Sequence, residues 1–334
     1  MTSDDSATPR NDLALLPARS GLGWGFLGVL AFSFTVPFTR VAVEGLSPLF
    51  IGAGRAVVAA VLAAVCLAAT RQRRPSRHQW ARLLVVGGGV VVGFPLLTSF
   101  ALTSVPASHG AVVIAMLPAA TAVTTVVRTG ERPPRAFWLA VLAGAVAALV
   151  FASVQDGALE PPGWADLLLV GAVLSAAVGY AEGGLLSREL GAWQTVSWAL
   201  VGGAPLMLAL TLVAVRRDPP QATPTEWAAF AYLGGVSMFL GFFAWYRGLA
   251  VGPMSSVSQV QLVQSVLTLT WAGLLLGERL TVATLVGGLV VIGCAAGAVR
   301  VRLAVADGDP ADGDPAEGDQ IRSRRPDRCP GPGR

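Results

Sequence analysis

The chain has 334 residues, of which 54% are hydrophobic and only 13% are charged, with a formal net charge of +4. Its mean hydropathy is +0.63. Soluble domains of this total length could not bury so much apolar surface, so the composition excludes an ordinary soluble protein. All 24 basic residues are arginines, which we interpret as a genome-wide compositional bias. The basic isoelectric point therefore does not indicate a nucleic-acid partner.

Ten apolar windows follow one another along the chain, each close to the roughly 20 residues that a helix needs to cross a bilayer core. Lipid offers the backbone no hydrogen-bond partner, and the windows lack the alternating polarity of barrel strands, so we expect helices. The second window contains Arg55, and the sixth reaches full length only by including Glu182 and running on to residue 186. The windows are 21–39, 48–70, 83–102, 107–127, 136–154, 167–181, 193–215, 227–246, 249–276 and 280–299.

The polar ends of the chain lie outside these windows. Residues 1–20 lack the basic end, apolar core and small-residue cleavage site of a signal peptide, so we expect a cytoplasmic tail and a retained first helix. Residues 303–334 contain a duplicated ADGDP segment, which is typical of low-complexity disorder. Cys66 and Cys294 lie in apolar windows and Cys329 in the tail, so we predict no disulfide framework, no metal site and no cofactor.

The arginines predict the orientation, because short cytoplasmic loops collect positive charge. With the N-terminus inside, the cytoplasmic loops hold ten arginines, whereas the outer loops hold three, or four with Arg40. An even number of spans then places the C-terminus inside as well. We therefore expect a multi-pass protein of the cell's inner (plasma) membrane with both termini in the cytoplasm. The ten cytoplasmic arginines are Arg71, Arg73, Arg74, Arg77, Arg82, Arg128, Arg132, Arg135, Arg188 and Arg247.

Two motifs recur at the same spacing and indicate an internal repeat. ALTSVP at residues 101–106 is matched by GLAVGP at 248–253, and Gly130-Glu131-Arg132 is matched by Gly277-Glu278-Arg279, each 147 residues on. The offset spans five membrane crossings, and an odd number places the second copy upside down. We therefore predict two inverted repeats, residues 21–154 and 164–300, which is the organisation of many alternating-access transporters.

Further motifs lie in the first two windows: FSF at residues 32–34, LSPL at 46–49, and Arg55. Together with both Gly-Glu-Arg turns, they resemble the EamA family of the drug/metabolite transporter superfamily over about residues 21–302. The resemblance implies ten helices in two halves of five, cytoplasmic termini, and export or uptake of amino acids, nucleobases, sugars or related metabolites. It also implies structural roles for Arg55 and the two turns. Ser33 stands where the family usually has tryptophan, and it is a candidate substrate contact.

Two ionisable residues are candidates for substrate binding or coupling, because charged groups at membrane depth are costly and need a partner or a function. Glu182 could bind a substrate amine or carry a coupling proton; the alternative is an interfacial carboxylate that is solvated or paired with arginine. His109, close to the loop before the fourth window, is either an interfacial histidine or a proton relay.

Amides and deep aromatic residues supply the other candidate cavity residues. Gln261 and Gln264 of the ninth window need partners in lipid and should face the interior, although the helical rotation keeps them and Gln259 off a single face. Tyr180 and Trp198 lie deep enough to stack on a planar solute, and the alternative for both is packing within the bundle.

Together these features predict an all-α integral membrane protein with ten transmembrane helices in two inverted five-helix repeats. We expect no enzyme but a secondary-active transporter, by preference an exporter, of a small polar metabolite such as an amino acid. A channel or facilitator is the nearer alternative, although no filter motif or acidic ring is present. A membrane-embedded enzyme is disfavoured because the chain has only two histidines and no nucleophile elbow. The expected partners are the solute, the bilayer and, in the coupled alternative, protons; monomer and homodimer both stay open.

Overall fold

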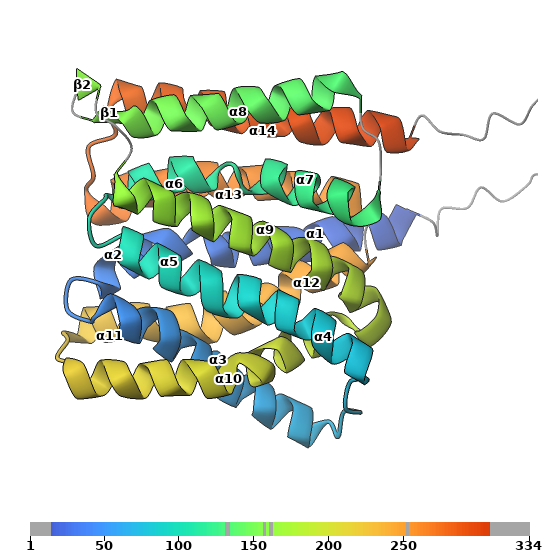
Figure 1. The fold of residues 1–334 in the computed structure, drawn as a ribbon, viewed down its shortest axis with the longest axis vertical. Helices are drawn as coiled ribbons and strands as arrows, with labels where there is room; N and C mark the ends of the chain where they lie inside the picture. The colour runs from blue at the N-terminus through green and yellow to red at the C-terminus, as the bar shows by residue number, and fades with distance from the viewer. Residues whose placement is uncertain (1–14, 131–133, 156–157, 160–162, 252–253, 308–334) are drawn as a thin grey trace, which may run out of the picture.

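The computed structural model describes residues 15–130, 134–155, 158–159, 163–251 and 254–307, and the helices run side by side along one direction (Figure 1). Glu131 and Arg132 of the first Gly-Glu-Arg motif lie outside the described residues. Up to residue 159 the elements are α1 (Leu15–Ser33), α2 (Thr35–Ala42), α3 (Pro48–Ala69), α4 (Arg77–Val86), η2 (Gly87–Gly93), α5 (Phe94–Ala101), α6 (Ala107–Ile114), α7 (Leu117–Thr129), α8 (Arg135–Ser153), β1 (Val154–Gln155) and β2 (Ala158–Leu159).

The second part of the chain is helical throughout its described residues. The two-residue strands before it pair antiparallel, with Val154 opposite Leu159. The helices that follow are α9 (Trp164–Leu190), α10 (Ala192–Arg217), α11 (Pro224–Ala231), η3 (Tyr232–Gly241), α12 (Phe242–Val251), α13 (Met254–Leu276) and α14 (Val282–Asp307).

Seven helical segments among the described residues are long and apolar enough to cross a membrane. This confirms the prediction of a helical, multi-pass membrane protein. The remaining three predicted windows contain shorter apolar stretches in α8, α13 and α14, namely Arg135–Ala148, Val260–Leu276 and Val282–Gly297. The seven long segments are Gly21–Ala42, Pro48–Ala69, Arg77–Ala101, Ala107–Arg128, Trp164–Leu190, Ala192–Arg217 and Pro224–Val251.

Several of these segments are interrupted, and proline accounts for one break directly. α1 ends at Ser33 and α2 begins at Thr35. Pro37 has no N–H to donate to the carbonyl of Ser33, four residues earlier, and Thr268 of α13 donates its hydroxyl to that carbonyl at 3.0 Å instead. A distant helix therefore stabilises the break. Two other segments widen into π-helices, η2 and η3.

Local features recur 147 residues apart in the structure. Ser76 and Gln79 form a capping box at the start of α4, and Thr223 and Glu226 form another at the start of α11. The π-helices follow these capping boxes at Gly87 and Tyr232, and left-handed glycines end α7 and α13, at Gly130 and Gly277. α4 begins at the right of Figure 1 and α11 at the left; α7 likewise ends at the right and α13 at the left.

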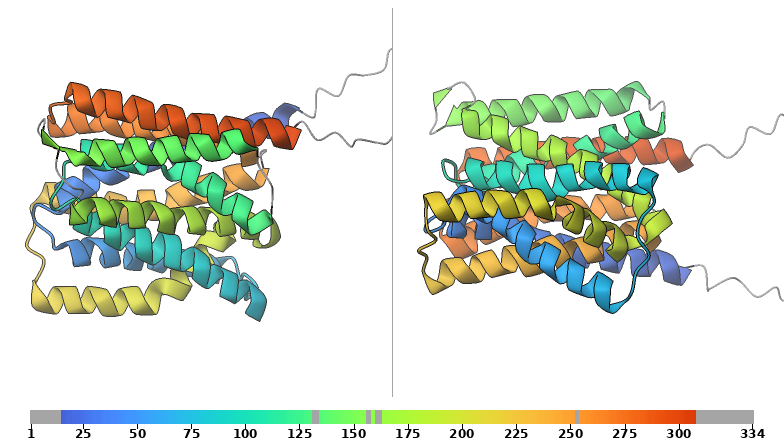
Figure 2. Two further views of the ribbon diagram at one scale, coloured as in Figure 1. Left: turned by 45° about the horizontal axis from the view of Figure 1, so that its top comes forward. Right: turned by 60° about the horizontal axis from the view of Figure 1, so that its bottom comes forward.

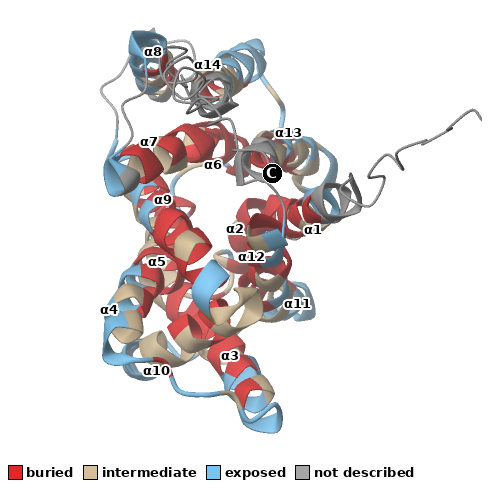
Figure 3. Ribbon diagram, turned by 90° about the vertical axis from the view of Figure 1, so that its right-hand side faces the viewer, coloured by how far each residue is buried: buried red, intermediate tan, exposed pale blue. Residues whose placement is uncertain are grey.

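The helices of the interior pack closely, whereas the outer faces are apolar and exposed. α3 lies against α10, and α8 lies against α14 at one edge of the bundle in all views (Figure 2). Buried residues face the middle of the bundle, and exposed ones lie mainly around it (Figure 3). Gly89 of η2 lets the backbone of α9 approach, since a Cβ there would lie 2.9 Å from the nitrogen of Gly179. The exposed leucines and valines of α8 and α14 suit contact with lipid.

The two ends of the bundle differ in charge. α1 begins and α14 ends at the right of Figure 1, and the α3–α4 connection and the end of α9 lie there too. We call this the arginine-rich end, after Arg71, Arg73, Arg74, Arg82 and Arg188 on those segments. The opposite end carries the α2–α3, α10–α11 and α13–α14 connections.

Candidate functional site

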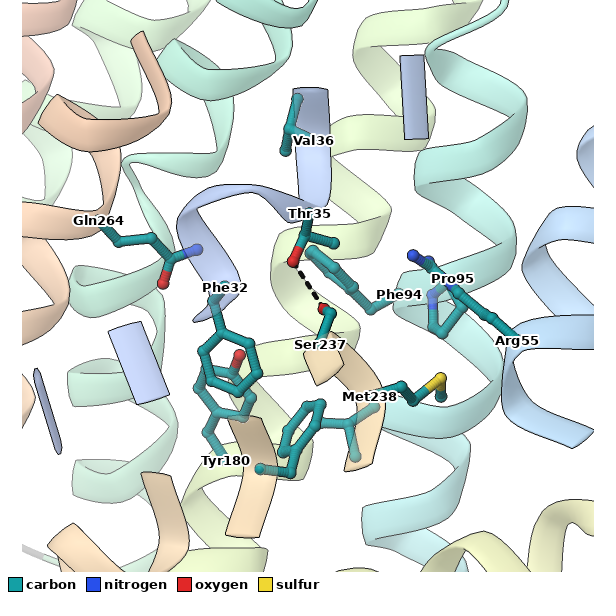
Figure 4. Close-up of a pocket in the computed structure, with 12 residues that line it drawn as sticks. Phe32, Thr35, Val36, Arg55, Phe94, Pro95, Tyr180, Ser237, Met238 and Gln264 are labelled. Atoms are coloured by element: carbon teal, nitrogen blue, oxygen red, sulfur yellow. Dashed lines mark hydrogen bonds between the residues drawn. The ribbon is translucent and has the colours of Figure 1, made fainter. Parts of the chain in front are cut away.

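A cavity of about 400 Å³ lies between helices from the early and the late parts of the chain (Figure 4). Its lining comes from α1, α2, α3, η2 and α5 on one side and from α9, η3, α12 and α13 on the other. We call it the central cavity. Its polar lining residues are Thr35, Arg55, Ser237 and Gln264, and its large apolar or aromatic ones are Phe32, Phe94, Tyr180, Met238 and Phe242.

Aromatic rings form one wall of the central cavity. Phe32 of α1 stacks with Tyr180 of α9 at a centroid distance of 6.5 Å, and it contacts the Phe242 ring edge-on at 4.8 Å. Tyr180 also meets Phe242 edge-on, at 5.8 Å. This cluster joins α1, α9 and α12, and it offers an apolar surface on which a hydrocarbon or planar group can pack.

Arg55 projects from α3 into this apolar surrounding. The residue is only 2% exposed, and its guanidinium donates to Thr98 Oγ1 at 3.2 Å and to Thr39 Oγ1 at 3.5 Å. Its Nε has no hydrogen-bond partner, and none of the ion pairs found among the described residues includes it. The structural role implied by sequence resemblance is therefore incomplete, because a cation held only by two hydroxyl groups borders the cavity.

The amides of α13 are buried, as predicted. Gln264 lines the central cavity, and its Oε1 has no hydrogen-bond partner in the described part of the chain. Gln261 is 2% exposed, and both its amide atoms lack a described partner, but it does not line this cavity. The two glutamines thus point in different directions, as helical rotation requires.

A hydroxyl pair crosses the central cavity where two helices are interrupted. Thr35 Oγ1 at the start of α2 and Ser237 Oγ in η3 lie 2.7 Å apart in one hydrogen bond. Figure 4 shows this bond between Phe32 and Phe94, with Arg55 on one side and Gln264 on the other. The polar groups therefore gather at the helix break and the π-helix, where the backbone departs from regular α-helix.

Glu182 lies outside the central cavity, in an ion cluster near the arginine-rich end. Its carboxylate is 6% exposed and accepts hydrogen bonds from Arg82 of α4 and, at 2.8 Å, from Arg128 of α7. Arg82 also pairs with Glu189. This arrangement is the arginine-paired alternative that the sequence left open, and it borders a separate opening of about 620 Å³ between α4, α7 and α9.

A second buried pair lies at the opposite end. His109 of α6 donates through Nε2 to Asp166 Oδ1 of α9 at 2.6 Å, since an ionised carboxylate can only accept. The other carboxylate oxygen of Asp166 accepts from the backbone nitrogen of Gly163 at 2.9 Å. α9 is thus held to the early helices at both ends, through Asp166 at one and Glu182 at the other.

The second Gly-Glu-Arg turn has a clear local function. Gly277 has a φ of 63° and ends α13, and Glu278 then accepts the backbone N–H groups of Ala107 and Ser108 at 2.8 Å each. The carboxylate therefore caps the N-terminus of α6, where helix N–H groups have no internal partner. Arg279 is exposed. The motif binds two distant helices together.

The remaining predicted substrate contacts lie away from the central cavity. Ser33 is completely buried; its hydroxyl donates to Leu30 O and accepts from Trp271 Nε1. Trp198 packs edge-on against Trp80 at 5.7 Å. Sequence reasoning missed Thr35, Ser237, Met238 and Phe242 as lining residues, since a hydroxyl or aromatic group in an apolar window carries no signal of which cavity it faces.

The sequence model of the EamA-like transporter family matches the chain twice, over residues 19–153 and 163–300. The chain belongs to the EamA-like transporter family. The predicted resemblance is thereby confirmed, and with it the drug/metabolite transporter superfamily. The chain is 43% identical over 288 residues to the "Uncharacterized transporter YdeK" of Bacillus subtilis (strain 168), covering 83% of this chain and 97% of that protein.

Two more distant similarities concern function and fold. The chain is 27% identical over 266 residues to the "Probable terminal-alkyne amino-acid exporter" of Streptantibioticus cattleyicolor, covering 78% of this chain and 87% of the relative. It also superposes on a crystal structure, described only as that of a protein, with a TM-score of 0.59 and 19% sequence identity, over 88% of this chain and 99% of the other. This last match concerns the fold alone. Within its family, the protein is a transporter.

Proposed function

We propose that the protein is a secondary-active exporter of a small polar metabolite, an amino acid or a close relative of one. The observation that carries the proposal is the central cavity, which has an aromatic wall, a buried cation and an unpaired amide oxygen. Pockets of this kind, mainly apolar with a few placed polar groups, suit small organic solutes. The amino-acid exporter among the relatives supports the same class of solute.

We further propose ten transmembrane helices in two inverted repeats, residues 21–154 and 164–300, with both termini in the cytoplasm. The capping boxes and left-handed glycines that recur 147 residues apart, at opposite ends of the bundle, support the inversion. The ends of α1 and α14 at the arginine-rich end support cytoplasmic termini. Inverted repeats of this kind allow one fold to open to either side of the membrane in turn.

The ion clusters of α9 support a carrier over a channel. Arg82, Arg128 and Glu182 bind helices together at the arginine-rich end, and His109 and Asp166 do so at the opposite end. A carrier needs closures on both sides of its site, of which one opens at a time. In this proposal, the two clusters are those closures, and Glu182 acts on transport through them without contacting the solute.

Counterflow in proteoliposomes tests the function. Vesicles are loaded with one unlabelled amino acid at a time, and uptake of the same amino acid in labelled form is followed. A carrier gives transient accumulation that saturates with concentration. Uptake that rises linearly with concentration and shows no counterflow, across the whole set of amino acids, would refute the proposal.

Labelling from one side of the membrane tests the topology. Cys66, Cys294 and Cys329 are first replaced by serine, and a single cysteine is then placed at Gly130 or at Gly277. An impermeant maleimide should reach the Gly277 site from outside intact cells and the Gly130 site only after the membrane is opened. Reaction of both sites from the same side contradicts the inverted repeats.

A further inference from the structure

The central cavity holds an uncompensated positive charge. Arg55 is 2% exposed and lies beside Phe94 and Pro95, with hydrogen bonds only to threonine hydroxyls. Its Nε–H lacks a partner, and none of the ion pairs among the described residues involves it. A buried charge is normally paired, and an unpaired one at membrane depth marks a ligand or transport site.

An unpaired acceptor faces the cavity from the other side. Gln264 of α13 lines the same cavity with its Oε1 buried and unpartnered in the described residues. Figure 4 shows Arg55 and Gln264 entering from opposite sides, with Phe32 and Tyr180 between and below them. The cavity therefore offers a cationic donor, an uncharged acceptor and an aromatic wall.

We propose that Arg55 binds the carboxylate of the transported solute and that Gln264 Oε1 accepts a hydrogen bond from its ammonium group. A guanidinium presents parallel N–H donors that match the two oxygens of a carboxylate. The apolar side chain of the solute then packs on Phe32, Tyr180 and Phe242. The solute class is a zwitterionic amino acid with a compact hydrocarbon side chain. This inference rests on the proposed function, because it assigns contacts within the same cavity.

Three probes separate the two contacts in the purified full-length protein. Leucine carries both charged groups, 4-methylpentanoate lacks the ammonium, and 3-methylbutylamine lacks the carboxylate. Binding is measured as the ligand-dependent rise in melting temperature in detergent micelles, which does not require transport. The two carboxylates should raise the melting temperature of the wild-type protein and the amine should not. A rise with the amine as large as with leucine, or no rise with either carboxylate, overturns the proposal.

Variants assign each contact to its residue. Arg55→Gln should abolish the shift with both carboxylates, and Arg55→Lys should keep it with affinity lowered at least tenfold, because lysine retains charge without the fork. Gln264→Leu should weaken leucine at least fivefold and leave 4-methylpentanoate unchanged. Arg247→Gln is the matched control, since that arginine stacks on Trp24 at 5.1 Å outside the cavity. Carboxylate binding that survives Arg55→Gln refutes the inference. The comparison of the three probes on wild-type protein decides the question even if one variant fails to fold.

Counterflow of labelled leucine separates this inference from the proposed function. Carboxylate-dependent binding without counterflow supports the Arg55 contact and contradicts the transport mechanism. Leucine counterflow that is unchanged in Arg55→Gln supports the carrier and overturns the assignment of Arg55.

Discussion

Replacing Arg55 by methionine should leave the protein at least as stable as the wild type. Arg55 is seven residues after the start of α3 at Pro48, which at 1.5 Å per residue is about 10 Å along the helix. The bilayer core is about 30 Å thick, so the guanidinium belongs to its deeper part. A stabilising role for Arg55 would require strong partners at this depth, and the described residues offer only two hydroxyls.

The opposing contributions can be compared. An arginine near a helix centre costs about 2.5–3.5 kcal/mol on insertion scales. The bond to Thr98 at 3.2 Å returns about 1.5 kcal/mol, and the bond to Thr39 at 3.5 Å lies at the limit of the geometry and returns less. Both hydroxyls also donate to backbone carbonyls at 2.7 Å, so removing the guanidinium leaves neither without a partner. We expect Arg55→Met to raise the free energy of unfolding by roughly 1 kcal/mol.

Equilibrium unfolding in mixed detergent micelles with increasing dodecyl sulfate measures this free energy. Arg247→Met, at the exposed cation–π contact, is the control and should change it by less than about 1 kcal/mol. A loss of about 3 kcal/mol or more in Arg55→Met, the size seen when a buried ion pair is broken, would refute the reasoning. It would mean that Arg55 has a partner that holds the fold together.

Three other substitutions test the remaining contacts. Glu182→Gln should lower the initial rate of counterflow at least tenfold while membrane insertion, measured by fractionation, stays normal, because two arginines lose their counter-charge; wild-type rates would reduce the cluster to a solvated surface group. Glu278→Gln should cost about 1 kcal/mol in detergent unfolding, since one of the two capped N–H groups loses its acceptor. Gly130→Ala should cost about 1 kcal/mol because its φ is 75°, whereas Gly88→Ala, also with open space around the new Cβ, should cost nothing; equal effects would contradict the backbone explanation.

Much of the architecture could be predicted from the sequence, because lipid imposes a simple rule on every segment. Apolar windows of membrane length must be helices, and the duplicated Gly-Glu-Arg motif pointed to the family. The interruptions were less predictable. Pro37 suggested a kink, but only the structure shows that Thr268, more than two hundred residues away, bonds the carbonyl that Pro37 leaves free. No residue pattern announced the π-helices η2 and η3.

The candidate site was predictable only in part, for a physical reason. Sequence periodicity gives the relative directions of side chains on one helix, but not the rotation of that helix against its neighbours. Tyr180 and Gln264 therefore lie at the cavity while Trp198 packs elsewhere, although all three were equally plausible. The same limit hid the partners of Glu182, because Arg82 lies one hundred residues before it and was read only as an orientation signal.

α9 connects the two closures mechanically. Asp166 and Glu182 are sixteen residues apart on this helix, about 24 Å at 1.5 Å per residue, so their clusters lie near opposite edges of a core about 30 Å thick. Both sets of partners belong to the early helices, and a tilt of α9 that separates one cluster can leave the other intact as a pivot. Opening both at once requires loss of both sets of hydrogen bonds, which suppresses a continuous pore. Combining His109→Ala with Glu182→Gln should therefore turn saturable flux into linear leak, whereas each single variant should stay saturable. Saturable flux in the double variant would show that other contacts close the path.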